Sequence, residues 1–321
     1  MILKVKARDR DVMAVGEAVA RICGEQLGAA YQRWQDRVGF AASHQREIAV
    51  YRQTDPRITR HVPRVLGSIA DDETDIFAVV LECIADATHL DSPSAGGDWN
   101  DAAVGTAIDG LARLQAVWYG RESDLRRLPW CGFERTAASI SEMTDLWTAL
   151  AVHARPSFCA WADPGISSVH RRLIAQAARW WRVLEAAPRT LIHNDFNPRN
   201  ICLRRIDSGP ALCAYDWELS TIGAPQRDLA ELLCFVLPHD VSRTTVDGWI
   251  ERHRRALARE TGSSIDPGQW REGFRSSLYD LLIDRVSMYA LIHRIRRQTF
   301  LPRVVRRWRR LYGFFPLAED A

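Results

Sequence analysis

Residues 191–205, "LIHNDFNPRNICLRR", place a histidine, an aspartate and three asparagines between two apolar runs. Asparagine, aspartate and proline favour turns, so one interpretation of this stretch is a purely structural turn. The other interpretation is a catalytic loop whose side chains converge on one point. We expect Asn194, Asn197 and Pro198 to be the turn formers, which leaves the remaining polar residues for chemistry.

Those remaining residues form the pattern H-x-D-x-x-x-x-N, with His193, Asp195 and Asn200 in its fixed positions. Sixteen residues after Asn200, Asp216 follows an apolar run. We predict an antiparallel hairpin around residues 206–210, which brings Asn200 and Asp216 together. Asp195 can accept or orient the proton of a substrate hydroxyl, and the side-chain oxygens of Asn200 and Asp216 suit Mg²⁺. This set of residues predicts phosphoryl transfer.

The chain has only two lysines among its 43 basic residues, Lys4 and Lys6, and both lie in one short strand-like segment. Residues two apart share one face of a strand. A lysine offers a compact point charge on a flexible stem, which arginine does not replace. Lys4 is therefore the candidate cation for nucleotide phosphates, and Glu47 on a predicted helix can hold it. We expect Lys6 to be a solvated strand residue.

Composition limits the class of protein. A chain of 321 residues with 47% hydrophobic residues and a net charge of +3 is expected to form one large domain or two lobes. The seven cysteines are scattered and form no C-x-x-C pair, which favours reduced thiols over disulfides or a zinc site. No secretory signal pattern and no run of 18 apolar residues occur, so we expect a cytoplasmic protein without a membrane span.

The segment 294–310 is strongly basic, and its apolar residues recur at helical spacing. The simpler interpretation is a C-terminal helix with one buried face and a solvated arginine face. A site for phosphate, an acidic partner or nucleic acid is the alternative, although the small net charge does not favour nucleic acid.

Hydrophobic periodicity predicts an α+β chain. We expect strands at 1–7, 62–69, 75–84, 201–205 and 211–215. We expect helices at 11–23, 26–36, 43–53 with Ser43 as its cap, 101–119, 134–153 and 166–187, and helices from 227 onward. The intervening loop at 85–101 is rich in Asp, Ser, Pro and Gly. It predicts a boundary between an N-terminal lobe, 1–84, and a C-terminal lobe, 85–321.

Taken together, these stretches resemble the aminoglycoside phosphotransferase family, small-molecule kinases related to the protein kinases. "LIHNDFNPRNI" resembles the catalytic loop of that family, and "AYDWELSTIGAPQRDLAELL" resembles its metal-binding strand and the following helix. "ILKV" and "REIAVY" are similar to the strand lysine and the helix glutamate, and "VVLECIAD" is similar to the adenine-binding hinge. The likeness extends over nearly the whole chain and is strongest at about 190–235.

The resemblance implies a protein-kinase-like fold of two lobes, a small N-terminal lobe with an antiparallel sheet and a large, mainly helical C-terminal lobe. It also implies two initial strands and a glycine-rich loop over the phosphates. No G-x-G-x-x-G pattern occurs here, so this lobe is expected to lack both. A segment upstream of the given sequence could supply the loop, or the helical material at 9–40 could replace it. Without either, we expect weak or absent nucleotide binding.

The resemblance also assigns roles to individual residues. Catalysis falls to Asp195, Mg²⁺ binding to Asn200 and Asp216, and nucleotide binding to Lys4, Glu47 and the backbone of Glu82 and Ile84. Structural support of the site falls to His193 and Asp228. The implied cofactors are ATP or GTP and Mg²⁺.

The expected activity is an ATP- or GTP-dependent O-phosphotransferase acting on a hydroxyl of a small molecule, such as an antibiotic or related metabolite. A role in antibiotic resistance would follow from an antibiotic acceptor. The acidic residues of the C-terminal third are mixed with many arginines, which favours a neutral or acidic acceptor over a polycation. A non-catalytic kinase-like nucleotide-binding or scaffold module is the alternative, and a nucleic-acid binder that uses the 294–310 arginines is a third.

Overall fold

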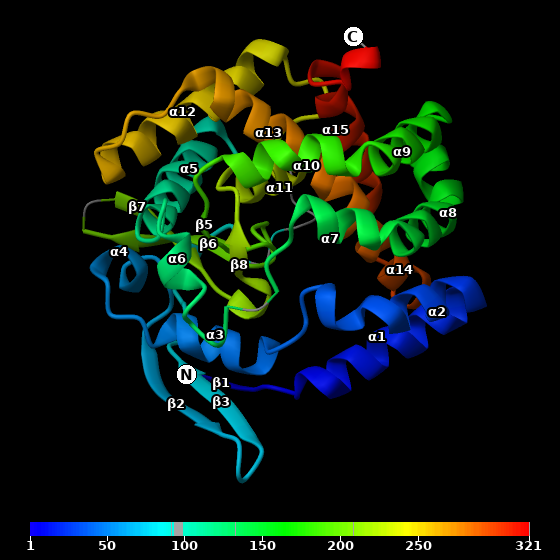
Figure 1. Ribbon diagram of the computed structural model, residues 1–321. Coiled ribbons are helices and arrows are strands. Elements are labelled where there is room, and N and C mark those ends of the chain that lie inside the picture. Colours follow the sequence, from blue (N-terminus) through cyan, green and yellow to red (C-terminus); the bar gives the residue numbers. More distant parts are fainter. Residues whose placement is uncertain (91, 93–98, 132, 208, 321) are drawn as a thin grey trace.

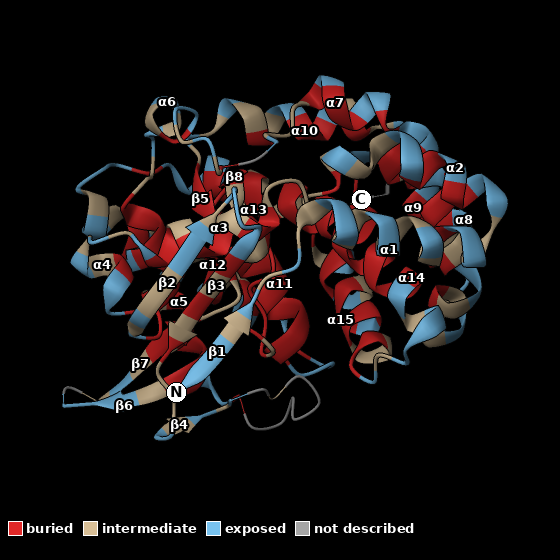
Figure 2. Cartoon of the chain, turned by 90° about the horizontal axis from the view of Figure 1, so that it is seen from below, coloured by how far each residue is buried: buried red, intermediate tan, exposed pale blue. Residues whose placement is uncertain are grey.

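The computed structural model describes residues 1–90, 92, 99–131, 133–207 and 209–320. Its N-terminal part contains a three-stranded antiparallel sheet in the order β1-β3-β2, with bounds Ile2–Val5 (β1), Val65–Asp71 (β2) and Ile76–Leu81 (β3) (Figure 1). β1 is an edge strand and is largely exposed (Figure 2). The sheet places Lys4 opposite Val79.

Helix α3, Ser43–Tyr51, lies between β1 and β2 in sequence and packs against β2 and β3. The residue before it, Ala42, is left-handed with φ 58°, and no side chain caps the helix. The prediction of Ser43 as the cap is therefore wrong, because Ser43 is already the first helical residue. The short helix α4, Pro56–Thr59, does have a side-chain cap, since Asp55 accepts from the Arg57 backbone N–H.

Between β1 and α3 the chain forms the helical hairpin α1, Asp9–Cys23, and α2, Glu25–Trp34, followed by the 3-10 turn η1, Gln35–Arg37. This hairpin packs against α8, Thr144–Trp161, and α14, Ser287–Ile295 (Figure 1). The segment that precedes α3 in sequence thus rests on the helical part of the molecule.

The rest of the chain is mainly helical around one large apolar core. Its remaining helices are α5 (Asp101–Ala116), α6 (Glu122–Leu125), α7 (Ala137–Glu142), α9 (Gly165–Ala175), α10 (Ala177–Ala186), α11 (Gln226–Val236), α12 (Arg243–Thr261), α13 (Pro267–Leu281) and α15 (Leu301–Phe314). Shorter turns are η2 (Trp217–Leu219), the π-helical η3 (Leu282–Val286) and η4 (Ala318–Asp320). No helix in the described part of the chain is long and apolar enough to span a bilayer.

Two small sheets lie within the helical part. One has the order β4-β6-β7, with bounds Ala87–Thr88, Ile201–Ile206 and Gly209–Ala214, and the other pairs β5, Thr190–Ile192, with β8, Thr221–Gly223. The predicted hairpin is present as β6 and β7. Sequence reasoning missed β4, β5 and β8, because strands of two or three residues are too short to show a period-2 pattern.

Two of the predicted helices are each divided. The predicted helix 134–153 is α7 and α8, and the predicted helix 166–187 is α9 and α10. A capping box formed by Thr136 and Ser139 starts α7. These breaks occur without proline or glycine, so hydrophobic spacing alone did not reveal them.

The basic C-terminal segment forms α15 with one buried face, as the simpler interpretation predicts. Its apolar residues Leu301, Val304, Val305, Trp308 and Leu311 are all buried. Arg307 donates to the Phe235 carbonyl and Arg309 lies 2.7 Å from Asp163 Oδ2. Part of the arginine face therefore serves the fold.

The described residues form an α+β chain with a small antiparallel sheet and a large helical part, as predicted. The boundary at residue 84 stays a prediction, and residues 91 and 93–98 of the predicted boundary loop lie outside the described residues.

Candidate active site

The loop at 193–200 connects β5 to β6, and α11 holds it in place. Asn194 is left-handed with φ 60°. Asp228, fully buried on α11, accepts the backbone N–H of His193 at 2.9 Å and that of Asn194 at 2.8 Å. Burial raises the pKa of Asp228, while the neighbouring His193 and these N–H groups favour the ionised form. The expected contact between Asp228 and the loop backbone is therefore present.

His193 links the loop to the segment that carries Asp216. Its Nε2 lies 2.9 Å from the Tyr215 carbonyl oxygen, and its ring centroid lies 4.5 Å from that of Trp217. The residue is buried. These contacts fit the bracing role that the resemblance implies.

Asp195 is buried and surrounded by hydrogen-bond donors. Its Oδ2 accepts from Asn200 Nδ2 at 2.7 Å, and its Oδ1 accepts from Asn197 Nδ2 at 3.0 Å and from the Tyr289 hydroxyl. Arg199 Nη2 lies 3.2 Å from Oδ2. The carboxylate orientation is thus set from several sides.

These partners also fix the charge of Asp195. Burial raises its pKa, but the charges of Arg199 and Arg285 and the hydrogen bond from Tyr289 outweigh burial and lower the pKa to about 2. The group is therefore ionised at neutral pH and is a weak base. Orientation of a hydroxyl suits it better than early removal of a proton, which a loose phosphoryl-transfer transition state does not require.

The β6–β7 hairpin brings Asn200 and Asp216 together, as predicted. The Tyr215 backbone N–H donates to the Asn200 carbonyl at 2.9 Å. Asn200 Nδ2 donates to Asp195 O at 2.9 Å and to Asp195 Oδ2, so its Oδ1 is the oxygen left to accept or to bind a cation. Asp216 is left-handed with φ 65°, a conformation that non-glycine residues adopt rarely and mostly where function requires it.

The two lysines connect β1 to these acids. Lys4 Nζ lies 2.8 Å from Glu47 Oε1 and 2.5 Å from Asp216 Oδ1, so the predicted Lys4–Glu47 pair is present. Lys6 Nζ lies 2.8 Å from Glu47 Oε2 and 2.5 Å from Glu218 Oε2. Its side chain is only 6% exposed, so the prediction of a solvated Lys6 is wrong. Burial lowers the pKa of Lys6, but the charges of Glu47 and Glu218 outweigh burial and raise it.

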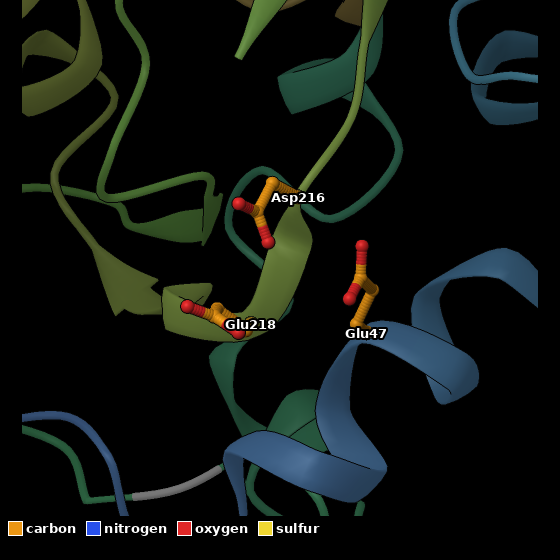
Figure 3. Close-up of side chains that lie close together, drawn as sticks. All are labelled: Glu47, Asp216 and Glu218. Carbon is orange, nitrogen blue, oxygen red and sulfur yellow. The ribbon is translucent and has the colours of Figure 1, made fainter. Parts of the chain in front are cut away.

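The acids themselves form a compact group. Figure 3 shows Glu47 on α3 close to Asp216, which follows β7, and to Glu218 in η2. Ligand atoms of the three lie within 4.8 Å of one another. Carboxylate and amide oxygens are the donors that Mg²⁺ prefers. Asp216 and Asn200 are therefore suitable ligands for the implied Mg²⁺. The positive charges of Lys4 and Lys6 offset the negative charges of Glu47, Asp216 and Glu218.

The residues predicted to bind nucleotide and metal line one cleft of about 410 Å³. This volume lies in the range of small-molecule sites. Among the described residues, none from 9–40 lines the cleft, so the α1–α2 hairpin is not the substitute for a glycine-rich loop. The lining includes Lys4, Glu47, Tyr51, Leu81, Glu82, Ile84, Arg199, Asn200 and Asp216.

Sequence reasoning missed three residues around Asp195 that come from distant helices. Tyr289 donates to Asp195 and also lies 3.1 Å from Glu231 Oε1. Arg285 donates to the Asn194 carbonyl at 2.9 Å. Glu231, Arg285 and Tyr289 lie 34 to 94 residues from the loop residues that they contact, so no sequence pattern within the loop could indicate them. Arg199 was visible in the loop, but spacing assigned it no role.

With this geometry established, the family can be stated. A model of the phosphotransferase enzyme family matches residues 15–272, which is most of the chain. The chain belongs to this family. This confirms the resemblance stated from the sequence, the predicted kinase-like two-lobe fold and the predicted phosphotransferase class. No curated protein matches the chain significantly.

Solved structures resemble the chain at low identity. A choline/ethanolamine kinase family protein from Mesorhizobium loti is 15% identical, with 86% of this chain and 81% of that chain covered and a TM-score of 0.48. An aminoglycoside phosphotransferase from Streptomyces rimosus, solved with ADP and streptomycin, is 20% identical, with 75% and 81% covered and a TM-score of 0.46. A choline kinase from Streptococcus pneumoniae is 15% identical, with 79% and 74% covered and a TM-score of 0.46.

Proposed function

We propose that this protein transfers the terminal phosphoryl group of ATP or GTP to a hydroxyl of a small molecule. One observation carries the proposal: Lys4, Asn200 and Asp216 line a single cleft, and Asp195 is hydrogen-bonded to Asn200 beside it. These residue types match the parts that phosphoryl transfer needs, which are a phosphate cation, metal ligands and a hydroxyl-orienting carboxylate.

In the proposed complex the hinge and the lysine position the donor. The backbone of Glu82 and Ile84, which line the cleft, would meet the adenine or guanine edge. Lys4 would contact the α- and β-phosphates while Glu47 holds its ammonium. Asn200 and Asp216 would hold Mg²⁺, which neutralises phosphate charge when it is bound.

Asp195 would orient the acceptor hydroxyl for in-line attack on the γ-phosphate. The acceptor hydroxyl would donate a hydrogen bond to the ionised Asp195 carboxylate. The carboxylate would then take up the hydroxyl proton as the new oxygen–phosphorus bond forms. Positioning supplies most of the rate in this scheme, and the loop is held rigidly enough to supply it. Asp228 and His193 fix that loop without contacting substrate.

The acceptor is proposed to be neutral or anionic. The acidic residues of the C-terminal third include Asp240, Asp247, Glu251, Glu260, Asp280 and Asp284, and all of these except Asp240 are paired with arginines. These pairs are Asp247–Arg271 at 2.6 Å, Glu251–Arg254 at 2.7 Å, Glu260–Arg113 at 3.2 Å, Asp280–Arg227 at 2.9 Å and Asp284–Arg135 at 2.8 Å. The described lining of the cleft contains none of these five acids. An antibiotic that is not a polycation is therefore the proposed type of acceptor, and a role in resistance would follow from it.

We further propose that the reaction takes place in the cytoplasm, where ATP is available and thiols stay reduced. The structure describes all seven cysteines as free. The division into lobes at residue 84 belongs to the same proposal, because the cleft lies where the hinge residues meet the β6–β7 hairpin.

The test is a panel of hydroxylated metabolites and antibiotics with Mg²⁺ and ATP or GTP, read out as nucleoside diphosphate release. Asp195→Asn, which keeps the side-chain shape, is expected to lower kcat by about 10²–10⁴-fold. Asp240→Asn is the matched control, since Asp240 is exposed on the α11–α12 loop. Equal turnover in Asp195→Asn and wild type would contradict the assignment. Nucleotide binding without turnover of any acceptor would favour the non-catalytic module.

A further inference from the structure

Arg199 is the residue of the catalytic loop whose contacts the scheme above leaves unused. It precedes Asn200 and lines the same cleft as Lys4, Asn200 and Asp216. Its side chain is 28% exposed, so it is not fully enclosed by the protein.

The protein holds one side of the guanidinium firmly. Nε lies 3.2 Å from Asn197 Oδ1, and Nη2 lies 3.2 Å from Asp195 Oδ2 and 3.1 Å from the Tyr289 hydroxyl. The guanidinium carbon lies 5.0 Å from the ring centroid of Tyr289 and 5.1 Å from that of Phe300. Cation–π contacts and hydrogen bonds together fix the plane of the group.

The other side of the guanidinium remains for a ligand. Among the described residues, none accepts a hydrogen bond from Arg199 Nη1. Nη1 is therefore left to donate to solvent or to a ligand, and Arg199 lines the cleft together with Asn200 and Asp216.

The charges of the cleft call for a second cation at this point. Lys4 is shared between Glu47 and Asp216, and Lys6 is shared between Glu47 and Glu218, so both ammonium groups are already balanced by carboxylates. No described segment of the lining supplies the backbone N–H groups of a glycine-rich loop. A triphosphate therefore needs a further donor, and the planar guanidinium fork matches phosphate oxygens.

We propose that Arg199 is a catalytic residue that contacts the γ-phosphate through Nη1 and stabilises the charge on the phosphoryl group in transit. The inference rests on the proposed function. Because the fixed Nη2 also touches Asp195, the same side chain places the γ-phosphate next to the carboxylate that orients the acceptor hydroxyl. An arginine that meets the transferring group is an established way of stabilising this transition state.

The experiment compares the affinities of ATP and ADP by calorimetry with Mg²⁺ in wild type, Arg199→Ala and Arg199→Lys. Because a γ-phosphate contact is lost, the affinity of Arg199→Ala for ATP is expected to fall by about 10-fold or more, while its affinity for ADP changes by less than about 2-fold. Arg199→Lys keeps the charge without the fork and is expected to lie between the two. Arg205→Ala is the matched control, because Arg205 is exposed on β6 and does not line the cleft.

Added guanidinium ion gives a second readout, since it should restore part of the turnover of Arg199→Ala and none in the Arg205→Ala control. An unchanged ATP-to-ADP affinity ratio in both Arg199 variants would overturn the inference and leave the proposed function standing. If Arg199→Ala does not fold, the ratio in Arg199→Lys decides. Failure of the wild type to bind either nucleotide would instead refute the proposed function, and this inference with it.

Discussion

Glu47 is the acid on which both lysines depend, and its replacement by glutamine tests that dependence. The carboxylate is fully buried. Oε1 accepts from Lys4 at 2.8 Å and from the Tyr51 hydroxyl at 3.2 Å, and Oε2 lies 2.8 Å from Lys6. Glutamine keeps the shape, but its amide nitrogen must face one of the two ammonium groups.

The expected cost follows from what each lysine retains. Removing one partner of a buried ion pair costs about 3–5 kcal/mol. Lys6 is buried but keeps Glu218, and Lys4 is 31% exposed and keeps Asp216, so solvent and the second carboxylate reduce the loss. We expect Glu47→Gln to lower the free energy of unfolding by about 3 kcal/mol. For a chain of this size, that corresponds to a fall in Tm of about 4–5 °C.

Thermal and urea unfolding measure this loss, with Glu73→Gln as the matched control. Glu73 is exposed in the β2–β3 turn, and the same chemical change there should alter stability by less than about 0.5 kcal/mol. The KM for ATP should also rise in Glu47→Gln, because Lys4 loses the group that positions it. Equal unfolding free energies in the two variants would refute the argument that Glu47 ties the lysines to the core.

Two other predictions concern buried groups. Asp228→Asn should lower kcat and reduce the free energy of unfolding by about 2 kcal/mol, because an amide cannot accept from both the His193 and Asn194 N–H groups. The control is Asp11→Asn on the exposed start of α1. Unchanged kcat and unchanged unfolding free energy in Asp228→Asn would contradict the bracing role. Burial lowers the pKa of His170 to about 3. The unfolded chain therefore takes up a proton below about pH 6.5 that the folded chain does not, and stability falls as pH drops from about 6.5 toward 3. His170→Leu should flatten that slope of unfolding free energy against pH by up to about 1.4 kcal/mol per pH unit, whereas the exposed control His239→Leu should not change it.

Much of the candidate site could be predicted because its parts are local. Asp195 and Asn200 lie in one eight-residue loop, and a hairpin turn is enough to carry Asp216 back to Asn200. In that loop and hairpin, a short separation along one supersecondary unit limits the distance between the side chains. The Lys4–Glu47 contact joins residues 43 apart, with α1 and α2 between them, and its prediction came from the parts that phosphoryl transfer needs.

The rest depended on how distant elements pack. Nothing in the spacing of β1 showed that Lys6 would be buried between Glu47 and Glu218 rather than solvated. That outcome required α3 and the segment after β7 to close on the same face of the strand. In the same way, the sequence did not show whether the α1–α2 hairpin covers the cleft. The structure shows that it packs on α8 and α14 instead.

The amino-acid sequence sets which chemical groups this protein carries and their order along the chain. The tertiary structure decided the state of those groups. Burial raises the pKa of Asp195, and the charge of Arg199 in the same loop lowers it. Arg285 and Tyr289, which packing brings against the loop from about 90 residues away, lower it further, to about 2. Charge and hydrogen-bond effects act over a few ångströms, so they follow from distances in space, which spacing along the chain does not specify.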